Sequence, residues 1–233
     1  MRLTQQIVVF LIFVSSSLLL NSCAKDDMMN EYNDVPSSEF AALSVFNGLG
    51  FGAGLDFSVD NKRINQGNEL LQPGDFLSFK TIFPGNRTIE ISTKANGTVL
   101  LSKAMEFKGS NFYSVFLYGR TYVKYLLTQD DFVVPKDRMA SLRFANLAEG
   151  KKVDIQIKQG NTLQKLSIGN EVTKFQDFSM EVMELQVSFQ GETEKSKTIS
   201  ITPSSQMLGT ICIYEGLVVQ TNQHDLLHSV IKY

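Results

Sequence analysis

Apolar and polar residues alternate along most of the chain after residue 40. The alternation is clearest at residues 55–59, 88–92, 153–157, 185–189 and 198–201. Successive side chains of a β-strand point to opposite faces, so this pattern predicts strands with one face on a core and the other in water. Between Ser38 and Gly216 the sequence shows no 3.6-residue period over the length of a helix. The pattern therefore predicts an all-β protein.

Turn-forming pairs separate these segments. Pro73-Gly74, Pro84-Gly85 and Asn96-Gly97 each interrupt the alternation. Proline presets one turn dihedral and glycine supplies positive φ, while Asn-Gly is a strong hairpin signal. We expect short strands joined by tight turns, with hairpins at Pro84-Gly85 and Asn96-Gly97.

The same pattern occurs twice, in the same order and with offsets of 96 to 99 residues. The matching segments are 43–47 with 142–146, 55–59 with 153–157, 89–92 with 185–188, and 113–119 with 210–216. Short strands recurring in a unit of about 100 residues are typical of immunoglobulin-like sandwiches. We predict two tandem immunoglobulin-like β-sandwich domains at 39–128 and 138–233.

The alternation also predicts which side chains enter each core. In the first sandwich these are Val45, Phe57, Val59, Ile91, Val115 and Leu117, and in the second Phe144, Ile155, Ile157, Val187, Cys212 and Tyr214. The joining segment near 128–138 is rich in charge, although its stretch 132–135 is apolar enough to dock against either sandwich. Contacts between domains of one chain are often modest and polar. We expect separable sandwiches with a semi-flexible junction.

The order of these motifs resembles the DUF4397 family of secreted and lipid-anchored bacterial proteins, which are usually twin repeats. A strand ending in Asn precedes an Asp-centred strand, a Pro-Gly turn, an aromatic strand and an Arg-Phe-x-Asn restart. The matching positions are Asn47, Asp56, Pro84, Gly85, Tyr113, Gly119, Arg143, Asn146 and Asp154. The second repeat departs from the pattern, because residues 181–184 replace the Pro-Gly turn. The resemblance implies a fold and a location, and it implies no activity.

The N-terminus has the build of a secretory signal. Arg2 precedes an apolar run at 7–20, which only Ser15, Ser16 and Ser17 interrupt. The run is too short to cross a bilayer, which takes about 20 apolar residues. It is apolar on all sides, unlike an amphipathic core helix. A charged start, a short apolar middle and a small-residue cut site predict a signal peptide at 1–22.

The cut site resembles the lipobox of bacterial lipoproteins. Leu20-Asn21-Ser22-Cys23 places leucine three positions before the cysteine and a small residue directly before it. The resemblance implies transfer of a diacylglyceryl group to the thiol of Cys23, cleavage before that residue, and acylation of the new amine, for example with palmitate. Several chains on one residue anchor firmly, because each buried CH₂ contributes about 0.8 kcal/mol. An ordinary signal peptide with an incidental cysteine is the alternative.

Lys25, Asp26 and Asp27 follow the cysteine and resemble the surface-export signal of Bacteroidota lipoproteins. We expect a lipoprotein of the cell outer membrane that faces the exterior; the alternative is an anchor facing the periplasm. Residues 23–38 are polar and without a pattern, so we interpret them as the lipidated cysteine and a flexible tether. An extended chain covers about 3.3 Å per residue, which is enough to lift the sandwiches off the membrane.

Charge and cysteine usage exclude several classes of function. The formal net charge is −2, so no basic field is present for nucleic acid. With Cys23 lipidated, Cys212 stands alone in the apolar run 210–214. We therefore expect no disulfide in a monomer, and a monomer is the state we predict. Cys212 has no histidine near it in sequence, which favours a buried, inert thiol over a nucleophile.

Two motifs superficially suggest cofactor or metal chemistry. The glycine-rich segment 48–54 follows a strand, as a dinucleotide loop does, but the next element is a strand where that mechanism needs a helix. His224 and His228 would share one face of a helix, but no third ligand is evident. We interpret the first as a loop and the second as a solvated C-terminal turn, and predict no cofactor and no metal.

Tyr118, Arg120, Tyr122 and Lys124 form a weak candidate ligand face. We expect them to line one face of a strand leaving the first repeat, where rings beside cations stack on sugars and bind carboxylates. A solvent-facing strand with cross-strand tyrosines is the alternative.

These features predict a non-enzymatic surface lipoprotein that acts in binding, adhesion or as an accessory of the envelope. Its partners would be the membrane and a glycan or protein ligand. The alternative is a polysaccharide-acting hydrolase that uses loop carboxylates. Acidic pairs such as Asp130-Asp131 cannot be called catalytic without geometry. A cleft with two carboxyl groups about 5–10 Å apart would favour the hydrolase.

The lipid anchor is open to a direct test. Cys23→Ala should abolish acylation and leave an unprocessed or mislocalised chain, because the thiol is the site of lipid attachment. Metabolic labelling with palmitate and membrane fractionation measure both effects. If the wild type takes up no label and the variant still fractionates with the outer membrane, the lipobox interpretation is wrong.

Overall fold

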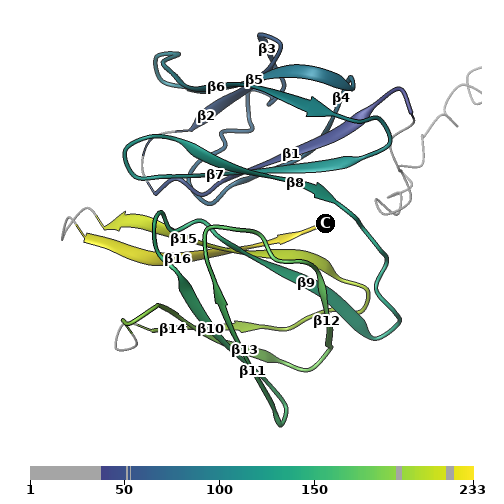
Figure 1. The fold of residues 1–233 in the computed structure, drawn as a ribbon, viewed down its shortest axis with the longest axis vertical. Coiled ribbons are helices and arrows are strands. Elements are labelled where there is room, and N and C mark those ends of the chain that lie inside the picture. The colour runs from purple at the N-terminus through teal and green to yellow at the C-terminus, as the bar shows by residue number, and fades with distance from the viewer. Residues whose placement is uncertain (1–37, 51, 53, 193–195, 219–222) are drawn as a thin grey trace, which may run out of the picture. The chain divides into compact units, whose positions relative to one another are not determined.

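Strands and their connections make up the described part of the computed structural model, which covers residues 38–50, 52, 54–192, 196–218 and 223–233 (Figure 1). The expected signal peptide, Cys23 and Lys25, Asp26 and Asp27 lie outside these residues. Within them we find sixteen strands and no helix, and therefore no helix able to span a membrane. The all-β prediction is confirmed.

The first repeat contains two four-stranded sheets with strand orders β4-β1-β7-β8 and β3-β2-β5-β6. Their core is formed by the predicted residues of β1, β2, β5 and β7, joined by others such as Ile89 and Phe107. The strands are β1 (Ala41–Asn47), β2 (Leu55–Val59), β3 (Lys62–Arg63), β4 (Phe76–Ile82), β5 (Gly85–Thr93), β6 (Val99–Phe107), β7 (Phe112–Tyr118) and β8 (Lys124–Asp130).

The second repeat has the same topology, with each strand eight positions later in the order. Its sheets run β12-β9-β15-β16 and β11-β10-β13-β14. The strands are β9 (Met139–Asn146), β10 (Val153–Gln159), β11 (Thr162–Ile168), β12 (Gln176–Ser179), β13 (Met183–Phe189), β14 (Lys197–Ile201), β15 (Leu208–Val218) and β16 (Gln223–Lys232). The predicted pair of tandem sandwiches is therefore confirmed.

In each sandwich, the two central strands of one sheet run parallel. β1 pairs with β7, and β9 pairs with β15, in equivalent registers. Figure 1 shows the result as stacked layers, in which the sheet of β1 and β7 faces the sheet of β9 and β15. Both strands β1 and β9 are buried on both faces, from Ala41 to Asn47 and from Ala140 to Asn146.

The two facing sheets share an apolar cluster, which differs from the polar junction we expected. Phe46 and Phe116 of the first repeat pack with Leu147, Cys212 and Tyr214 of the second. Both sandwiches belong to one compact unit. The expectation was wrong because it weighed only the joining segment, whereas sheet faces make the contact. Phe132 of that segment does dock, with its ring centroid 4.9 Å from that of Tyr233 and 5.2 Å from that of Phe112.

Cys212 and Tyr214 lie in this shared cluster and not in the core of the second sandwich, where Ile211 and Ile213 take the predicted places. The error is one of register. The aligned glycines suggested that 113–119 corresponds to 210–216, but the strand pairing makes Leu117 equivalent to Ile213. A one-residue slip moves every side chain of a strand to the opposite face.

The turn predictions had mixed outcomes. Asn96-Gly97 joins the paired strands β5 and β6, so that hairpin is confirmed. Pro84-Gly85 connects β4 to β5, which belong to different sheets of the sandwich. This connection is therefore a crossover between layers, and the hairpin expected there is wrong.

A buried ion pair crosses the interface between the repeats. Arg143 of β9 lies 2.7 Å from Asp130 at the end of β8, and both side chains are almost fully buried. Arg143 also donates to the hydroxyls of Thr210 (2.8 Å) and Tyr233 (3.1 Å), and it lies over the ring of Phe175. Burial opposes its charge, but Coulombic interactions with Tyr233 and Asp130 outweigh that effect and raise the pKa of Arg143.

The carboxylate of Asp130 also has hydrogen-bond partners in the first repeat. It accepts hydrogen bonds from the hydroxyls of Thr128 and Ser114. Ser114 in turn contacts the Ser44 hydroxyl at 2.8 Å. The pair is thus held by polar side chains of both repeats, as a buried charge requires.

Phe116→Ala tests whether the shared cluster couples the repeats. Loss of this fully buried ring should reduce the free energy of unfolding by about 3–5 kcal/mol. We expect one cooperative thermal transition, shifted as a whole, in the full mature chain. Phe83→Ala is the matched control, because that ring is exposed. Two transitions, of which only the first-repeat one moves, would contradict the coupling.

Candidate functional site at the junction of the two repeats

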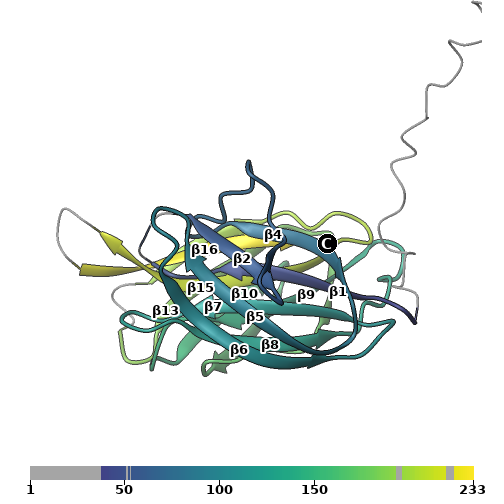
Figure 2. The ribbon, with the colours of Figure 1, turned by 90° about the horizontal axis from the view of Figure 1, so that it is seen from above.

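Loops from both repeats meet at one end of the molecule, which we call the loop end. The parallel strands β1 and β7 end there, at Asn47 and Tyr118. Strand β9 ends beside them, since Leu147, the residue after β9, lies against Gly48. The chain enters β1 at Ala41, at the opposite end, which we call the entry end. Figure 2 shows the C-terminus near the start of β1, and the amide of Tyr233 bonds to Leu208 at the start of β15.

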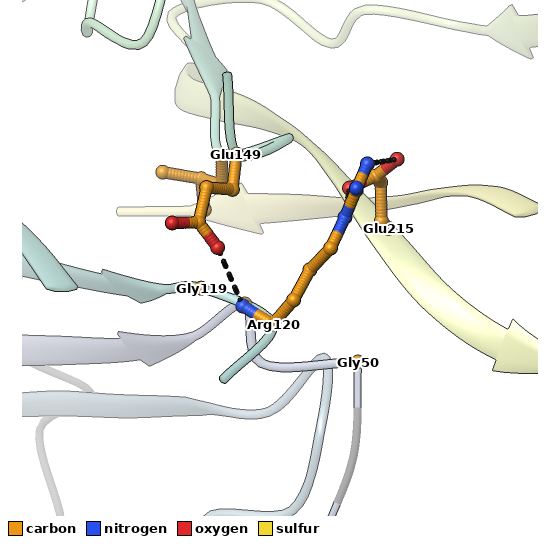
Figure 3. Close-up of a pocket in the computed structure, with 7 residues that line it drawn as sticks. Gly50, Gly119, Arg120, Glu149 and Glu215 are labelled. Carbon is orange, nitrogen blue, oxygen red and sulfur yellow. Dashed lines mark hydrogen bonds and ion pairs between the residues drawn. The ribbon is translucent and has the colours of Figure 1, made fainter. Parts of the chain in front are cut away.

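A small pocket at the loop end is lined by Gly48, Gly50, Gly119, Arg120, Leu147, Glu149 and Glu215. The first four come from the first repeat and the others from the second. Figure 3 shows Arg120 extending between the two glutamates. The pocket therefore requires both repeats.

Glu215 carries the most buried charge of the pocket. Arg120 binds it in bidentate fashion, with Nε 2.8 Å from Oε2 and Nη2 2.7 Å from Oε1. Lys151 Nζ lies 3.3 Å from the same Oε1. The hydrogen bond to Glu215 is the main cause that raises the pKa of Arg120. This planar two-bond geometry fixes the position of the first-repeat turn on the second repeat.

Glu149 binds the same turn from the other side. Its Oε2 accepts the backbone N–H of Arg120 at 2.8 Å, and its Oε1 lies 2.5 Å from Lys124 Nζ. The hydrogen bond from Lys124 is the largest of the effects that hold the pKa of Glu149 below its usual range. Each charged side chain that lines the pocket is therefore already paired.

Two glycines make this approach of the chains feasible. A Cβ on Gly50 would collide with the backbone of Glu215, and a Cβ on Gly119 would collide with the carbonyl of Tyr122. Gly119 also has φ of +128°, a conformation that L side chains rarely adopt. The described residues of the glycine-rich segment 48–54 thus lie in the connection between β1 and β2, where we predicted a loop, and Gly50 packs against the second repeat.

The four residues predicted as a ligand face lie at this end, but they do not share one strand. β7 ends at Tyr118 and β8 begins at Lys124, so Arg120 and Tyr122 lie in the connecting turn. The positive φ of Gly119 ends strand β7. The alternation of apolar and polar residues in the sequence does not reveal this strand end. Arg120 and Lys124 are used in ion pairs, whereas Tyr122 is 77% exposed.

Sequence reasoning missed Glu149, Lys151 and Glu215. The signal for Glu215 was present: Tyr118 of the first aromatic strand is followed by Gly119, whereas Tyr214 of the second is followed by an acid, Glu215, before the next glycine. Glu149 and Lys151 lie in a loop whose sequence has no motif. Their role follows only from the packing of one repeat on the other.

The other candidate residues lie in buried contacts or on a strand. Asp130 belongs to the buried pair with Arg143. Cys212 is fully buried, and burial strongly raises the pKa of its thiol. His224 and His228 lie on strand β16, so the expected C-terminal turn is wrong. Over the described residues, no group of three or more His, Cys, Asp or Glu side chains is arranged to hold a metal ion.

Comparison with known proteins assigns a family. Residues 41–156 match the model of the family described as "Domain of unknown function (DUF4397)". These residues belong to the DUF4397 family. The DUF4397 match covers the first sandwich and continues into β10 of the second, so it includes Arg120, Asp130, Arg143 and Glu149. The resemblance expected from the motifs is confirmed.

Similarities beyond the family are distant. No curated protein matches this sequence. A carbohydrate-binding module of family CBM26 from Eubacterium rectale Amy13K, solved in complex with maltoheptaose, aligns at 10% identity with a TM-score of 0.28, covering 83% of this chain and 97% of that one. A leucine-rich repeat protein from Bacteroides thetaiotaomicron aligns at 8% identity with a TM-score of 0.22, covering 74% of this chain and 26% of that one. At these scores neither similarity bears on function.

Glu215→Gln tests the linkage at the loop end. Arg120 would lose its bidentate carboxylate and Lys151 one of its two acidic partners, and a hydrogen bond to a charged group contributes about 1.5–3 kcal/mol. We expect a fall of that order in the free energy of unfolding, measured by denaturant titration.

Glu149→Gln is the control, because its pair with half-exposed Lys124 should contribute only about 0–1 kcal/mol. The pKa of Glu149 is lowered in the folded state, so its contribution exists above the unfolded pKa of about 4.3 and disappears as the pH falls through the folded value. Equal losses in both variants at neutral pH would contradict the distinction.

Proposed function

We propose that this chain is a lipoprotein, anchored through Cys23 to the cell outer membrane and facing the exterior, that acts as a non-enzymatic binding or adhesion module. Its ligand, a glycan or a protein, would bind at the loop end around Tyr122. The lipobox and the residues Lys25, Asp26 and Asp27 support the location.

One observation carries the binding role. At the loop end, loops of two sandwiches are joined by Arg120, Glu149 and Glu215 into one surface, and Tyr122 stands exposed beside them. An aromatic ring on a fixed surface binds with little loss of conformational freedom. The chain enters at the opposite end, so an anchored molecule would present this surface away from the membrane.

The hydrolase alternative has one observation in its favour, since Glu149 and Glu215 line the same pocket. Glycoside hydrolysis needs one carboxyl group that stays protonated to act as an acid. The pKa of Glu149 is instead lowered, and Glu215 is bound by Arg120 and Lys151. Both carboxylates hold the repeats together, which favours the binding role.

The location is tested with protease added to intact cells. Surface exposure predicts digestion of the wild type, and protection when Lys25, Asp26 and Asp27 are all replaced by alanine, because the chain then remains inside. Equal digestion of both would refute the export signal.

Binding is tested by a glycan-array and protein-capture screen with the full mature chain. Tyr122→Ala should weaken any ligand found by about tenfold or more, because loss of an aromatic anchor at a binding surface often costs 2 kcal/mol or more. Phe83→Ala is the control, since that ring is also exposed and follows Ile82, which pairs with Ala41 at the entry end. Unchanged affinity in Tyr122→Ala would exclude the loop end as the binding surface.

A further inference from the structure

Large apolar side chains are exposed at the entry end. Phe83 follows β4, whose last residue Ile82 pairs with Ala41 at the start of β1. Its ring is 64% exposed and contacts Phe40, where the chain enters. Phe83 therefore lies next to the point at which the tether reaches the sandwich.

The segment that joins the repeats continues this edge. It connects Asp130 at the end of β8 to Met139 at the start of β9, and Figure 1 shows it running along the side on which β1 begins. Phe132 is anchored among aromatic rings, which fixes the segment, while Val133 and Val134 point outward with 74% and 49% exposure.

The second repeat adds two more exposed apolar side chains. Ser179 at the end of β12 pairs with Met139 at the start of β9, and Met180 and Val182 follow it directly. Both are exposed. We call the set Phe83, Val133, Val134, Met180 and Val182 the entry-end apolar residues.

The charged residues at this edge do not form a basic patch. The joining segment carries Asp131 and Asp137 against Lys136 and Arg138, and all four are exposed, as are Glu39 and Glu181 at the same end. The edge is therefore not an electrostatic site for an anionic partner. Exposed apolar side chains without a basic patch fit a surface that accepts apolar groups and neutral head groups.

The length and position of the tether indicate what covers these residues. The segment between Cys23 and Phe40 reaches no more than about 55 Å when extended, at about 3.3 Å per residue. An acylated Cys23 would hold the entry end near the lipid surface at all times. The bilayer is then present at a high effective concentration, and a weak apolar contact suffices to bind it.

We infer that the entry-end apolar residues dock against the membrane that holds the lipid anchor, so that the stacked sandwiches stand on the bilayer with the loop end outward. This inference rests on the proposed lipoprotein function for the tethering, while the docking surface itself belongs to the folded chain. Phe83, Val133 and Val134 enter the head-group region, and the charged side chains of this edge remain in water.

The experiment replaces the lipid by an artificial tether, so that it does not depend on acylation. The mature chain with Cys23→Ser is held by an N-terminal histidine tag on nickel-chelating vesicles of phosphatidylcholine. A fluorophore sensitive to polarity is attached at Val133→Cys, or at Tyr122→Cys as the loop-end control. Cys212 is fully buried and remains unlabelled. We expect a blue shift and several-fold stronger quenching by lipid-borne quenchers at position 133, and neither change at position 122.

A charged pair of substitutions tests the contact itself. In the chain labelled at Met180→Cys, the double variant Val133→Glu/Val134→Glu should reduce quenching by lipid about tenfold. Val99→Glu is the matched control. Val99 has the same side chain at 50% exposure, and it lies at the loop end, since it pairs with Ser92 beside the start of β2. High salt should leave the contact unchanged, because vesicles of phosphatidylcholine carry no net charge.

The outcomes separate the two proposals. If Cys23 is acylated in cells but position 133 stays as unquenched as position 122, docking is wrong and the lipoprotein function stands. If position 133 is quenched but Cys23 takes up no palmitate, docking stands and the anchor is wrong. Equal quenching at both positions would overturn docking. A blue shift at position 133 that occurs without vesicles and grows with protein concentration would also overturn it, and would show that a second copy of the chain covers these residues.

Discussion

The ion pair between Asp130 and Arg143 determines how the two repeats meet. A buried guanidinium without its carboxylate would cost about 3–5 kcal/mol, so the sheets can approach only where the two side chains coincide. A pair of this kind adds little net stability over apolar residues, but it selects one arrangement. The surrounding apolar cluster supplies the attraction, and Thr210, Tyr233, Ser114 and Thr128 satisfy the remaining polar atoms.

The loop end depends on that arrangement. Arg120 reaches Glu215 only when β7 and β15 lie in facing sheets in one register, and Gly50 then packs on the backbone of Glu215. The repeats therefore contact each other in two places. The buried faces of their sheets form one contact, and the loops that line the pocket form the other. The geometry of the pocket follows from the core and does not vary independently of it.

Much of the fold could be predicted from the sequence because strand alternation is a local signal. Phe57, Ile91, Ile155 and Val187 all lie in the cores where the period of two placed them. The contact between the repeats could not be predicted in this way. A strand such as β1, buried on both faces, interrupts the alternation with an apolar run, and that run does not say which surface covers the second face. Arg120 pairs with Glu215, 95 positions away, and Arg143 with Asp130, 13 positions away. Neither spacing indicates in the sequence that the two residues are in contact.

The two copies of the fold are no longer interchangeable. The strand registers place Ser44 of the first copy where the second has Arg143, and both contact a hydroxyl on the neighbouring parallel strand. The first copy thus supplies the anion, Asp130, and the second the cation, Arg143, so two first repeats would lack the cation and two second repeats the anion. The outer sheets present polar residues along β6 and β11 and have no such complement. The two repeats are therefore complementary at their shared face and not copies that could replace one another.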